Sequence, residues 1–196
     1  MKALPRVEGR VAVLDRADVD TDQIIPKQFL KRIERTGYGE FLFFDWMKDP
    51  AFELRRPGAA GASILIAGRN FGCGSSREHA AWALEDYGFR AVLAPSFGDI
   101  FRSNAIKVGV APVALPAADL ARLRIAVADR NELVVDLVSL EVRHPDGLAF
   151  AFELDPYDQE TLVQGLDDIA RTLRHAEAID AFESQHPARF DARALA

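Results

Sequence analysis

The segment Gly68–His79 concentrates residues that could bind and activate an anionic substrate. It reads Gly-Arg-Asn-Phe-Gly-Cys-Gly-Ser-Ser-Arg-Glu-His and lies between an apolar run that ends at Ala67 and a helix expected from about Ser76. Backbone N–H groups at a helix N-terminus have no partner within the helix, so they can point at an anion. A hydroxyl in this position, with a cation nearby, has its alkoxide stabilised. Ser75 is therefore a candidate base, with Arg77 as the nearby cation.

The glycines of this segment do not match the common nucleotide-binding patterns. A dinucleotide fingerprint would need a third glycine where Arg77 stands, and a phosphate loop would need Gly-Lys-Ser/Thr. Ser75 also lacks the glycine two places further on that a nucleophile elbow requires. A nucleotide ligand and an elbow-type hydrolase are therefore disfavoured.

Two other interpretations of these residues stay open. Ser75 and Glu78 have the spacing of a capping box, which would give the serine a structural role that is compatible with a catalytic one. His79 lies one helical turn after Ser75, so a serine–histidine pair, as in a hydrolase, is a second option. A histidine beside a helix start is at least as often a packing residue.

A second polar segment, Asp18–Gln23, alternates acids with other residues in the manner of a calcium-binding loop. It lacks both the glycine and the bidentate glutamate that such a loop requires, so calcium is disfavoured. An Asp-rich turn that caps the following helix accounts for Asp18 and Asp20 equally well. Asp22 is the better functional candidate.

A third segment, Phe29–Arg35, mixes apolar side chains with cations next to this acidic turn. A solvated helix face accounts for most of the pattern. A pocket for a small acid with a hydrocarbon branch would account for it too, because carboxylates pair with Arg or Lys and a branched alkyl group packs on Phe, Leu or Ile.

The composition limits the class of protein that could carry these segments. The chain has 196 residues, of which 49% are hydrophobic, and a net charge of −6, which disfavours nucleic acid as a partner. Its single cysteine, Cys73, cannot form an internal disulfide or hold a metal cluster by itself. No apolar run approaches the roughly 20 residues of a membrane span, and no signal peptide is evident, so we expect a cytoplasmic location without membrane contact.

The middle of the chain predicts the elements that position the first segment. Apolar runs alternate with helical patterns, which favours a parallel sheet with crossover helices, an α/β core. The expected strands are 62–67, 90–94 and 110–115, and the expected helices are about 76–87 and 97–108.

The remaining segments are expected to complete a single domain over residues 1–196. On the N-terminal side a short apolar run at 11–14 ends in an acidic, turn-prone segment. We then expect a helix beginning near Lys27 that ends by Gly37 and Gly39, and an aromatic segment, 41–47, in the core or an interface. On the C-terminal side we expect a helix at 116–127, two strands, 132–142 and 148–154, around a turn at 144–147, and a helical tail from about 157. Residues 185–196 would be loose or would pack on a partner.

Three segments carry a resemblance to a known family. They are Asp-Thr-Asp-Gln-Ile-Ile-Pro-Lys-Gln-Phe-Leu at 20–30, Asn-Phe-Gly-Cys-Gly-Ser-Ser-Arg-Glu-His-Ala at 70–80 and Ala-Pro-Ser-Phe-Gly-Asp-Ile-Phe at 94–101. The chain resembles the small-subunit family of 3-isopropylmalate dehydratase, in the aconitase superfamily. The resemblance covers nearly the whole chain, and the Gly-Ser-Ser-Arg-Glu-His string is highly specific for that superfamily.

The resemblance implies a swivelling β/β/α domain like the last domain of aconitase, which closes over a separate large subunit. That partner would carry a [4Fe-4S] cluster, while this chain would bind no metal and Cys73 would only line the loop. The implied reaction interconverts 2-isopropylmalate and 3-isopropylmalate by dehydration to 2-isopropylmaleate and rehydration, in leucine biosynthesis. The chain would then be a hydro-lyase only together with its large subunit, acting on a small dicarboxylate.

The resemblance also assigns roles to individual residues. Ser75 would be the catalytic base and Asp22 would support the catalytic network, while Ser76 and Arg77 would contact a substrate carboxylate. Side chains expected to read the substrate's side group, or to replace the loop arginine of aconitase, are Phe29, Leu30, Ile33, Arg32 and Arg35. Two alternatives stay open: the small subunit of homoaconitase or of a methylmalate-type hydro-lyase, and a noncatalytic anion-binding module.

Overall fold

A computed structural model describes residues 1–32 and 34–186 of the chain. The chain divides into two compact units, Met1–Gly165 and Leu166–Ala196, and each is described by itself. The expectation of one domain over 1–196 therefore stays a prediction. Ile33 and the segment 185–196, apart from its first two residues, lie outside the described residues.

The first unit is built around a four-stranded parallel sheet in the order β2-β3-β4-β5. Its strands are β2 (Val11–Leu14), β3 (Ile64–Ala67), β4 (Ala91–Ala94) and β5 (Ala111–Ala114). β3 and β4 are buried at every position, as expected of short apolar runs covered on both faces. The predicted parallel α/β core is confirmed.

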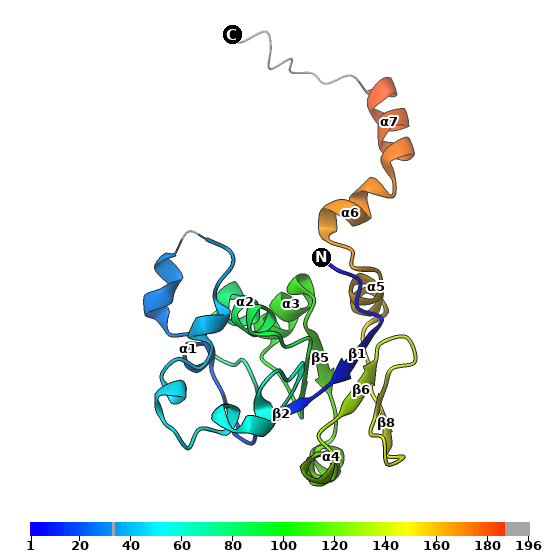
Figure 1. The fold of residues 1–196 in the computed structure, drawn as a ribbon. Coiled ribbons are helices and arrows are strands. Elements are labelled where there is room, and N and C mark those ends of the chain that lie inside the picture. The colour runs from blue at the N-terminus through cyan, green and yellow to red at the C-terminus, as the bar shows by residue number, and fades with distance from the viewer. Residues whose placement is uncertain (33, 187–196) are drawn as a thin grey trace. The chain divides into compact units, whose positions relative to one another are not determined.

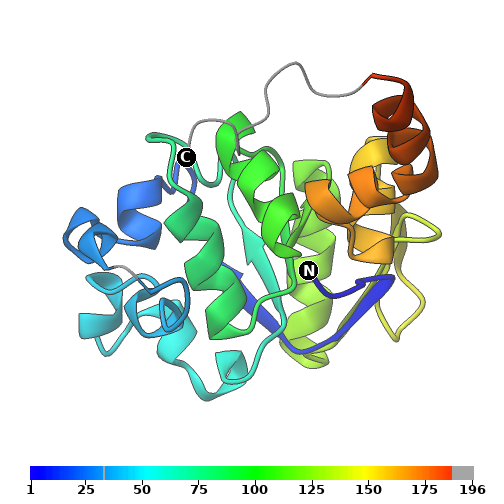
Figure 2. The same cartoon turned by 90° about the horizontal axis from the view of Figure 1, so that it is seen from above.

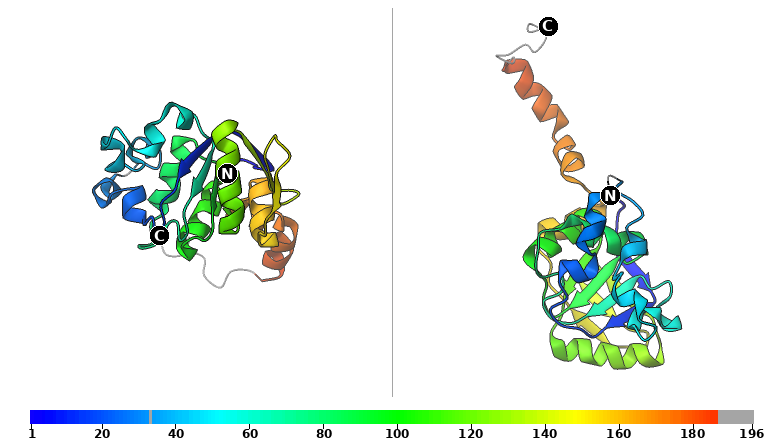
Figure 3. Two further views of the ribbon diagram at one scale, coloured as in Figure 1. Left: turned by 90° about the horizontal axis from the view of Figure 1, so that it is seen from below. Right: turned by 90° about the vertical axis from the view of Figure 1, so that its left-hand side faces the viewer.

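Helices cover both faces of this sheet (Figure 1). On one face lie α2 (Glu78–Tyr87) and α3 (Asp99–Val108), which Figure 2 shows from above, and on the other lies α4 (Ala117–Asp129), seen from below in Figure 3. Two hydrophobic cores result: Leu84 and Phe101 pack with Leu65 on the first face, and Leu123 packs with Ile64 on the second. α2 and α3 begin about two residues later than the sequence pattern indicates, and each ends at a left-handed glycine, Gly88 or Gly109.

A second sheet of four antiparallel strands, in the order β1-β6-β7-β8, packs in the same hydrophobic core as α4. Its strands are β1 (Arg6–Gly9), β6 (Leu133–Asp136), β7 (Glu141–Arg143) and β8 (Ala149–Ala151). The prediction of one strand over 132–142 is wrong, because a turn separates β6 from β7. The Asp136 carboxylate accepts hydrogen bonds from the N–H groups of Val138 and Ser139, both at 3.0 Å, and Leu140 has a left-handed φ of 56°. The expected β7–β8 turn at 144–147 is confirmed.

The segment between β2 and β3 consists of short turns of helix rather than one long helix. They are α1 (Thr21–Ile24) and the 3₁₀ turns η1 (Lys27–Lys31), η2 (Gly39–Phe41), η3 (Trp46–Lys48), η4 (Glu53–Arg55) and η5 (Pro57–Ala59). The helix predicted from Lys27 is thus only a 3₁₀ turn. The aromatic segment lies in the core as expected, with Phe43 fully buried and stacked on Trp46.

The C-terminal part of the chain is helical, as predicted. α5 (Pro156–Gln164) closes the first unit, and the second unit contains α6 (Asp168–Leu173) and α7 (Ala176–Gln185). Among the described residues, no helix is both long and apolar enough to cross a bilayer.

Candidate active site

Three loops meet at the carboxyl edge of the parallel sheet. They follow β2, β3 and β4 and comprise residues 15–22, 68–77 and 95–98. Parallel strands end at a common edge, and in open α/β sheets this edge is where ligands bind. The topology therefore brings together the segments that the sequence analysis singled out.

Main-chain hydrogen bonds join the first two loops. The N–H of Gly72 donates to the carbonyl of Val19 at 2.7 Å, and the N–H of Thr21 donates to the carbonyl of Cys73 at 2.9 Å. The Thr21 hydroxyl donates to the carbonyl of Ser75 at 2.9 Å, and this threonine is buried. Thr21 thus fixes the backbone at Ser75 next to α1.

The third loop is held in the same way. The N–H of Phe71 donates to the carbonyl of Ser96 at 3.0 Å, and the N–H of Gly98 donates to the carbonyl of Phe71 at 2.9 Å. The Ser96 hydroxyl accepts a hydrogen bond from the N–H of Asn70 at 2.9 Å. The loop that carries Ser75 is therefore fixed on both sides.

The glycine spacing of the second loop follows from close packing. Gly72 has a φ of 74°, and a Cβ at that position would lie 2.1 Å from Cγ of Phe101. A Cβ on Gly98 would lie 2.6 Å from the Gly72 carbonyl oxygen. Only glycine permits this approach of the two loops, so the glycine spacing of the Gly-Cys-Gly motif has a structural cause at Gly72.

Asp22 and Arg77, far apart in the sequence, form an ion pair at this edge through Nη1 of the arginine. The Arg77 side chain is 14% exposed and the Asp22 side chain is 50% exposed. The arginine is therefore mostly covered by protein, whereas its carboxylate partner faces the open surface. The Arg77 guanidinium holds the pKa of the Asp22 carboxyl below its usual value, and the charge of Lys27 adds a smaller effect. Arg77 is thereby fixed in place with a negative partner.

Ser75 and Ser76 are exposed beside this pair and precede the N-terminus of α2. The predicted capping box of Ser75 with Glu78 is wrong, because α2 begins at Glu78 with Arg77 as N-cap and without a side-chain cap. Within residues 1–32 and 34–186, the main-chain N–H groups of 74–77 form no hydrogen bond to the protein. They remain available to an anion.

The capping box of this edge occurs instead in the acidic segment. The Asp20 carboxylate accepts from the N–H of Gln23 at 2.8 Å, and the Gln23 side chain accepts from the N–H of Asp20 at 2.9 Å. Asp18 instead pairs with Arg69 and accepts from Asn70 at 3.0 Å. The capping role expected for Asp20 is confirmed, and Asp22 is left facing Arg77.

His79 points into an aromatic cluster. Its ring centroid lies 4.5 Å from that of Trp82 and 5.2 Å from that of Tyr38, and burial lowers the pKa of the His79 imidazole. In the part of the chain that the structure describes, no hydrogen bond joins His79 to Ser75. The geometry does not favour a serine–histidine pair.

The segment 29–32 packs beside the same edge but is more enclosed than the sequence pattern indicates. The Phe29 ring stacks on Phe41 with centroids 4.1 Å apart, and Leu30 is half-buried against the same core. Arg32 pairs with Glu40 at 3.2 Å and with Glu34 at 3.6 Å, so two carboxylates already share its charge. Arg35 lies over the Trp82 ring at 5.7 Å.

Sequence reasoning missed Lys27, which lies next to Asp22, although Lys31 falls in the cationic segment Phe29–Arg35. Lys27 and Lys31 line an open pocket of about 630 Å³ together with Asp22, Gln28 and Asp45. Both lysines are exposed. The segment Asp20–Leu30 contains Lys27, but the position of Lys27 relative to Asp22 depends on α1 and on the turn at Pro26.

The described residues offer no metal centre. Nowhere among them do three His, Cys, Asp or Glu side chains gather in a way that could hold a metal ion. Burial raises the pKa of the Cys73 thiol, and the carboxylates of Asp20 and Asp18 add to this effect. The residues that the structure describes thus provide no ligand set for an iron–sulfur cluster.

The fold and this edge define the chain as an aconitase-type C-terminal domain. The family described as "Aconitase C-terminal domain" matches residues 1–118, and a second family, the C-terminal domain of the 3-isopropylmalate dehydratase small subunit, matches residues 168–191. The chain belongs to the family of 3-isopropylmalate dehydratase small subunits, and the expected aconitase-like α/β fold is confirmed.

Named relatives support this assignment over nearly the full chain. The 3-isopropylmalate dehydratase small subunit of Acidobacterium capsulatum is 53% identical, with 97% of this chain and 93% of the relative covered. That of Bacillus subtilis is 51% identical, with 94% and 96% covered. A crystal structure of 3-isopropylmalate dehydratase from Methanocaldococcus jannaschii is 27% identical, with a TM-score of 0.67 and with 90% of this chain and 99% of that chain covered.

Proposed function

We propose that this chain is the substrate-closing half of a 3-isopropylmalate dehydratase. It would interconvert 2-isopropylmalate and 3-isopropylmalate through 2-isopropylmaleate, in leucine biosynthesis and in the cytoplasm. The observation that carries the proposal is the convergence of Asp22, Ser75 and Arg77 at one sheet edge, in a member of this family.

The reaction removes a carbon-bound proton next to a carboxylate while a hydroxyl group leaves, so it needs a strong base and cations on the carboxylates. Ser75 is our candidate for the base. Its backbone is held by Thr21, its side chain faces solvent, and free N–H groups beside it favour negative charge. The alkoxide of Ser75 would take the proton from the substrate carbon.

Arg77 and Ser76 would hold a substrate carboxylate. A guanidinium binds a carboxylate through two parallel hydrogen bonds, and the pairing with Asp22 restricts Arg77 before substrate arrives. Asp22 acts on substrate through Arg77, so we propose it as a positioning residue. Lys27, which is exposed, adds a second cation on the same side.

The substrate's isopropyl group would face the segment 29–32. Phe29 and Leu30 offer half-buried apolar surface there. Arg32 is the weaker candidate for a direct substrate contact, because Glu40 and Glu34 already pair with it. We propose that Arg32 holds the loop against Tyr38 and Phe41 instead.

The chain supplies only one side of this site. The dehydration also needs a Lewis acid on the departing oxygen, and we propose that a large subunit brings it as a [4Fe-4S] cluster. The open surface at Asp22, Ser75 and Ser76 is the face that this partner would cover.

The proposal is tested by anaerobic reconstitution. The full chain is assayed alone and with its candidate large subunit, using 3-isopropylmalate and following the ultraviolet absorbance of the unsaturated intermediate. Citrate and homocitrate serve as competing substrates. Turnover only in the mixture, and with preference for the isopropyl acid, is expected.

Other outcomes of this assay separate the alternatives. Preference for homocitrate or a methylmalate would keep the mechanism and contradict the substrate. Binding of a dicarboxylate without turnover, with an intact cluster on the partner, would contradict the enzymatic role and favour an anion-binding module.

A further inference from the structure

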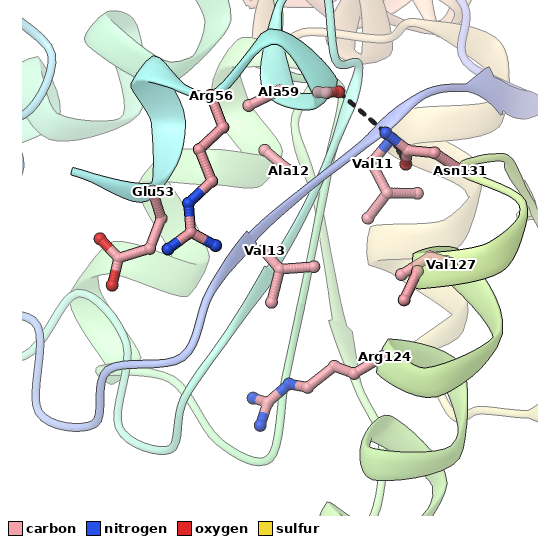
Figure 4. Close-up of a pocket in the computed structure, with 11 residues that line it drawn as sticks. Val11, Ala12, Val13, Glu53, Arg56, Ala59, Arg124, Val127 and Asn131 are labelled. Atoms are coloured by element: carbon pink, nitrogen blue, oxygen red, sulfur yellow. Dashed lines mark hydrogen bonds between the residues drawn. The ribbon is translucent and has the colours of Figure 1, made fainter. Parts of the chain in front are cut away.

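We propose that a second pocket, along the outer edge of β2, binds a small carboxylate with a short apolar side chain. The pocket has a volume of about 310 Å³ and lies between α4 and the turns η4 and η5 (Figure 4). Its lining includes Val13, Arg56, Arg124, Val127 and Asn131. None of the proposed active-site residues lines it.

Arg124 has one hydrogen-bond donor with no acceptor. Its Nη1 pairs with the Asp15 carboxylate at 2.5 Å, and its Nη2 donates to the carbonyl of Ala67 at 3.1 Å. Its Nε is buried, and among the described residues nothing accepts from it. Buried N–H groups are nearly always satisfied, so this donor indicates an acceptor that the protein itself does not provide.

The edge strand supplies a second donor. β2 is outermost in its sheet, and the N–H of Val11 points outward to the Asn131 side chain at 2.9 Å. Backbone direction alternates along a strand, so the N–H of Val13 also points outward, and it forms no hydrogen bond within the described part of the chain. Asn131 also donates to the Gly58 carbonyl at 2.8 Å and closes one end of the pocket.

The charge balance of the pocket favours an anion. Its one lining carboxylate, Glu53, is already bound by two nitrogens of Arg16, at 3.2 Å and 3.0 Å. Arg56 reaches toward β2 from the opposite side to Arg124. Its charge helps to lower the pKa of the Glu53 carboxyl, but Glu53 forms its salt bridge with Arg16, and no salt bridge joins Arg56 to a described residue. The unused groups are thus all donors.

The remaining lining restricts the ligand further. Val11, Val13 and Val127 are apolar, and a pocket of this size holds a molecule of about ten non-hydrogen atoms. In a ligand with a carboxylate and a short apolar side chain, the carboxylate would accept hydrogen bonds from two or three of these donors, and the apolar side chain would pack on the valines. Inorganic phosphate would satisfy the donors but leave the apolar wall uncovered.

The test uses the full chain, labelled with ¹⁵N, and two probes of equal shape. 4-Methylpentanoate carries the charge, and 4-methylpentanamide is its neutral counterpart. We expect saturable shifts of the Val13 N–H and the Arg124 Nε–H signals with the acid and at least tenfold weaker binding of the amide. Equal binding of both probes, shifts confined to residues 70–79, or tighter binding of phosphate would overturn the proposal.

Variants locate the site without removing Arg124, whose Nε is buried. Arg56→Gln is expected to weaken acid binding about tenfold, the loss typical of one charged hydrogen bond. Ala128→Phe fills the pocket from the exposed side of α4 and is expected to abolish binding. Arg122→Gln is the matched control, because this arginine lies on α4 over the Phe150 ring, and it should bind normally.

A complex with the large subunit provides a final check. If the large subunit excludes the acid by protecting the Val13 N–H itself, the pocket is a protein interface and the proposal is wrong. Retained binding of the acid in the complex supports it.

Discussion

At the residue scale, the proposed chemistry depends on the Asp22–Arg77 pair and on the serines beside it. The sequence predicts each residue separately, but their contact depends on two loops that come together only through the sheet. The same limit explains why the sequence analysis did not place Lys27 beside Asp22. The Ser75–Glu78 spacing led to the wrong prediction of a capping box, because Arg77 and not Ser75 is the N-cap of α2.

Arg77→Gln should raise the pKa of the Asp22 carboxyl toward its ordinary value, because the main cause of the lowered pKa is removed. A lowered folded-state pKa means that the pair's contribution to stability is present above the unfolded pKa and is lost as pH falls through the folded pKa. The wild-type chain should therefore lose more stability than the variant between about pH 4 and the folded pKa of Asp22. Carboxyl ¹³C titration checks the pKa directly. An unchanged Asp22 pKa in the variant would contradict the pairing.

Arg77→Lys should raise KM for the isopropyl acid in the reconstituted enzyme, because a two-point contact becomes a point charge. Steady-state kinetics with the large subunit provide the measurement. The control is Arg122→Lys, on the far helix α4. Unchanged KM and kcat in Arg77→Lys would count against its role as the carboxylate ligand.

At the element scale, the sequence predicts the regular α/β core well and the irregular segments poorly. Short apolar runs such as Ile64–Ala67 are unambiguous strands because both faces are buried. The break between β6 and β7 was missed because Val138 and Leu140 continue an apolar pattern, while the Asp136 carboxylate caps a turn. η1 ends at Lys31 because the backbone of Arg32 is extended, with a φ of −69° and a ψ of 143°.

Gly72→Ala should destabilise the chain more than Gly61→Ala. The two glycines have similar φ values, 74° and 70°, so both variants carry a strain of about 1–2 kcal/mol. Only at Gly72 does the new methyl meet Phe101, which should add about 1–3 kcal/mol, whereas nothing lies within 4 Å at Gly61. Urea unfolding of both variants gives the difference. Equal losses would show that the loops do not pack as described.

At the scale of the whole molecule, the edge that carries Asp22, Ser75 and Arg77 is open, as the proposed joint site with a large subunit requires. The free N–H groups before α2 and the exposed serines face outward, and the chain offers no metal centre among the residues described. Family membership explains why the fold could be predicted from sequence, whereas the geometry that we propose a partner completes could not be.

Binding of the large subunit with substrate should slow hydrogen exchange at the N–H groups of residues 74–77, which have no acceptor among the described residues of this chain. The β7–β8 turn at 144–147 serves as an internal control and should exchange at an unchanged rate. Mass-spectrometric exchange on the complex and on the chain alone provides the comparison. Unaltered exchange at 74–77 would place the partner elsewhere.

The most direct test of the central claim is the turnover of Ser75→Ala in the anaerobically reconstituted enzyme. Loss of a positioned base should lower kcat by about 10²- to 10⁴-fold with a modest change in KM. Ser103→Ala, at an exposed serine of α3, is the matched control and should keep full activity. Near-normal turnover of Ser75→Ala would contradict the assignment of Ser75 as the base at this sheet edge.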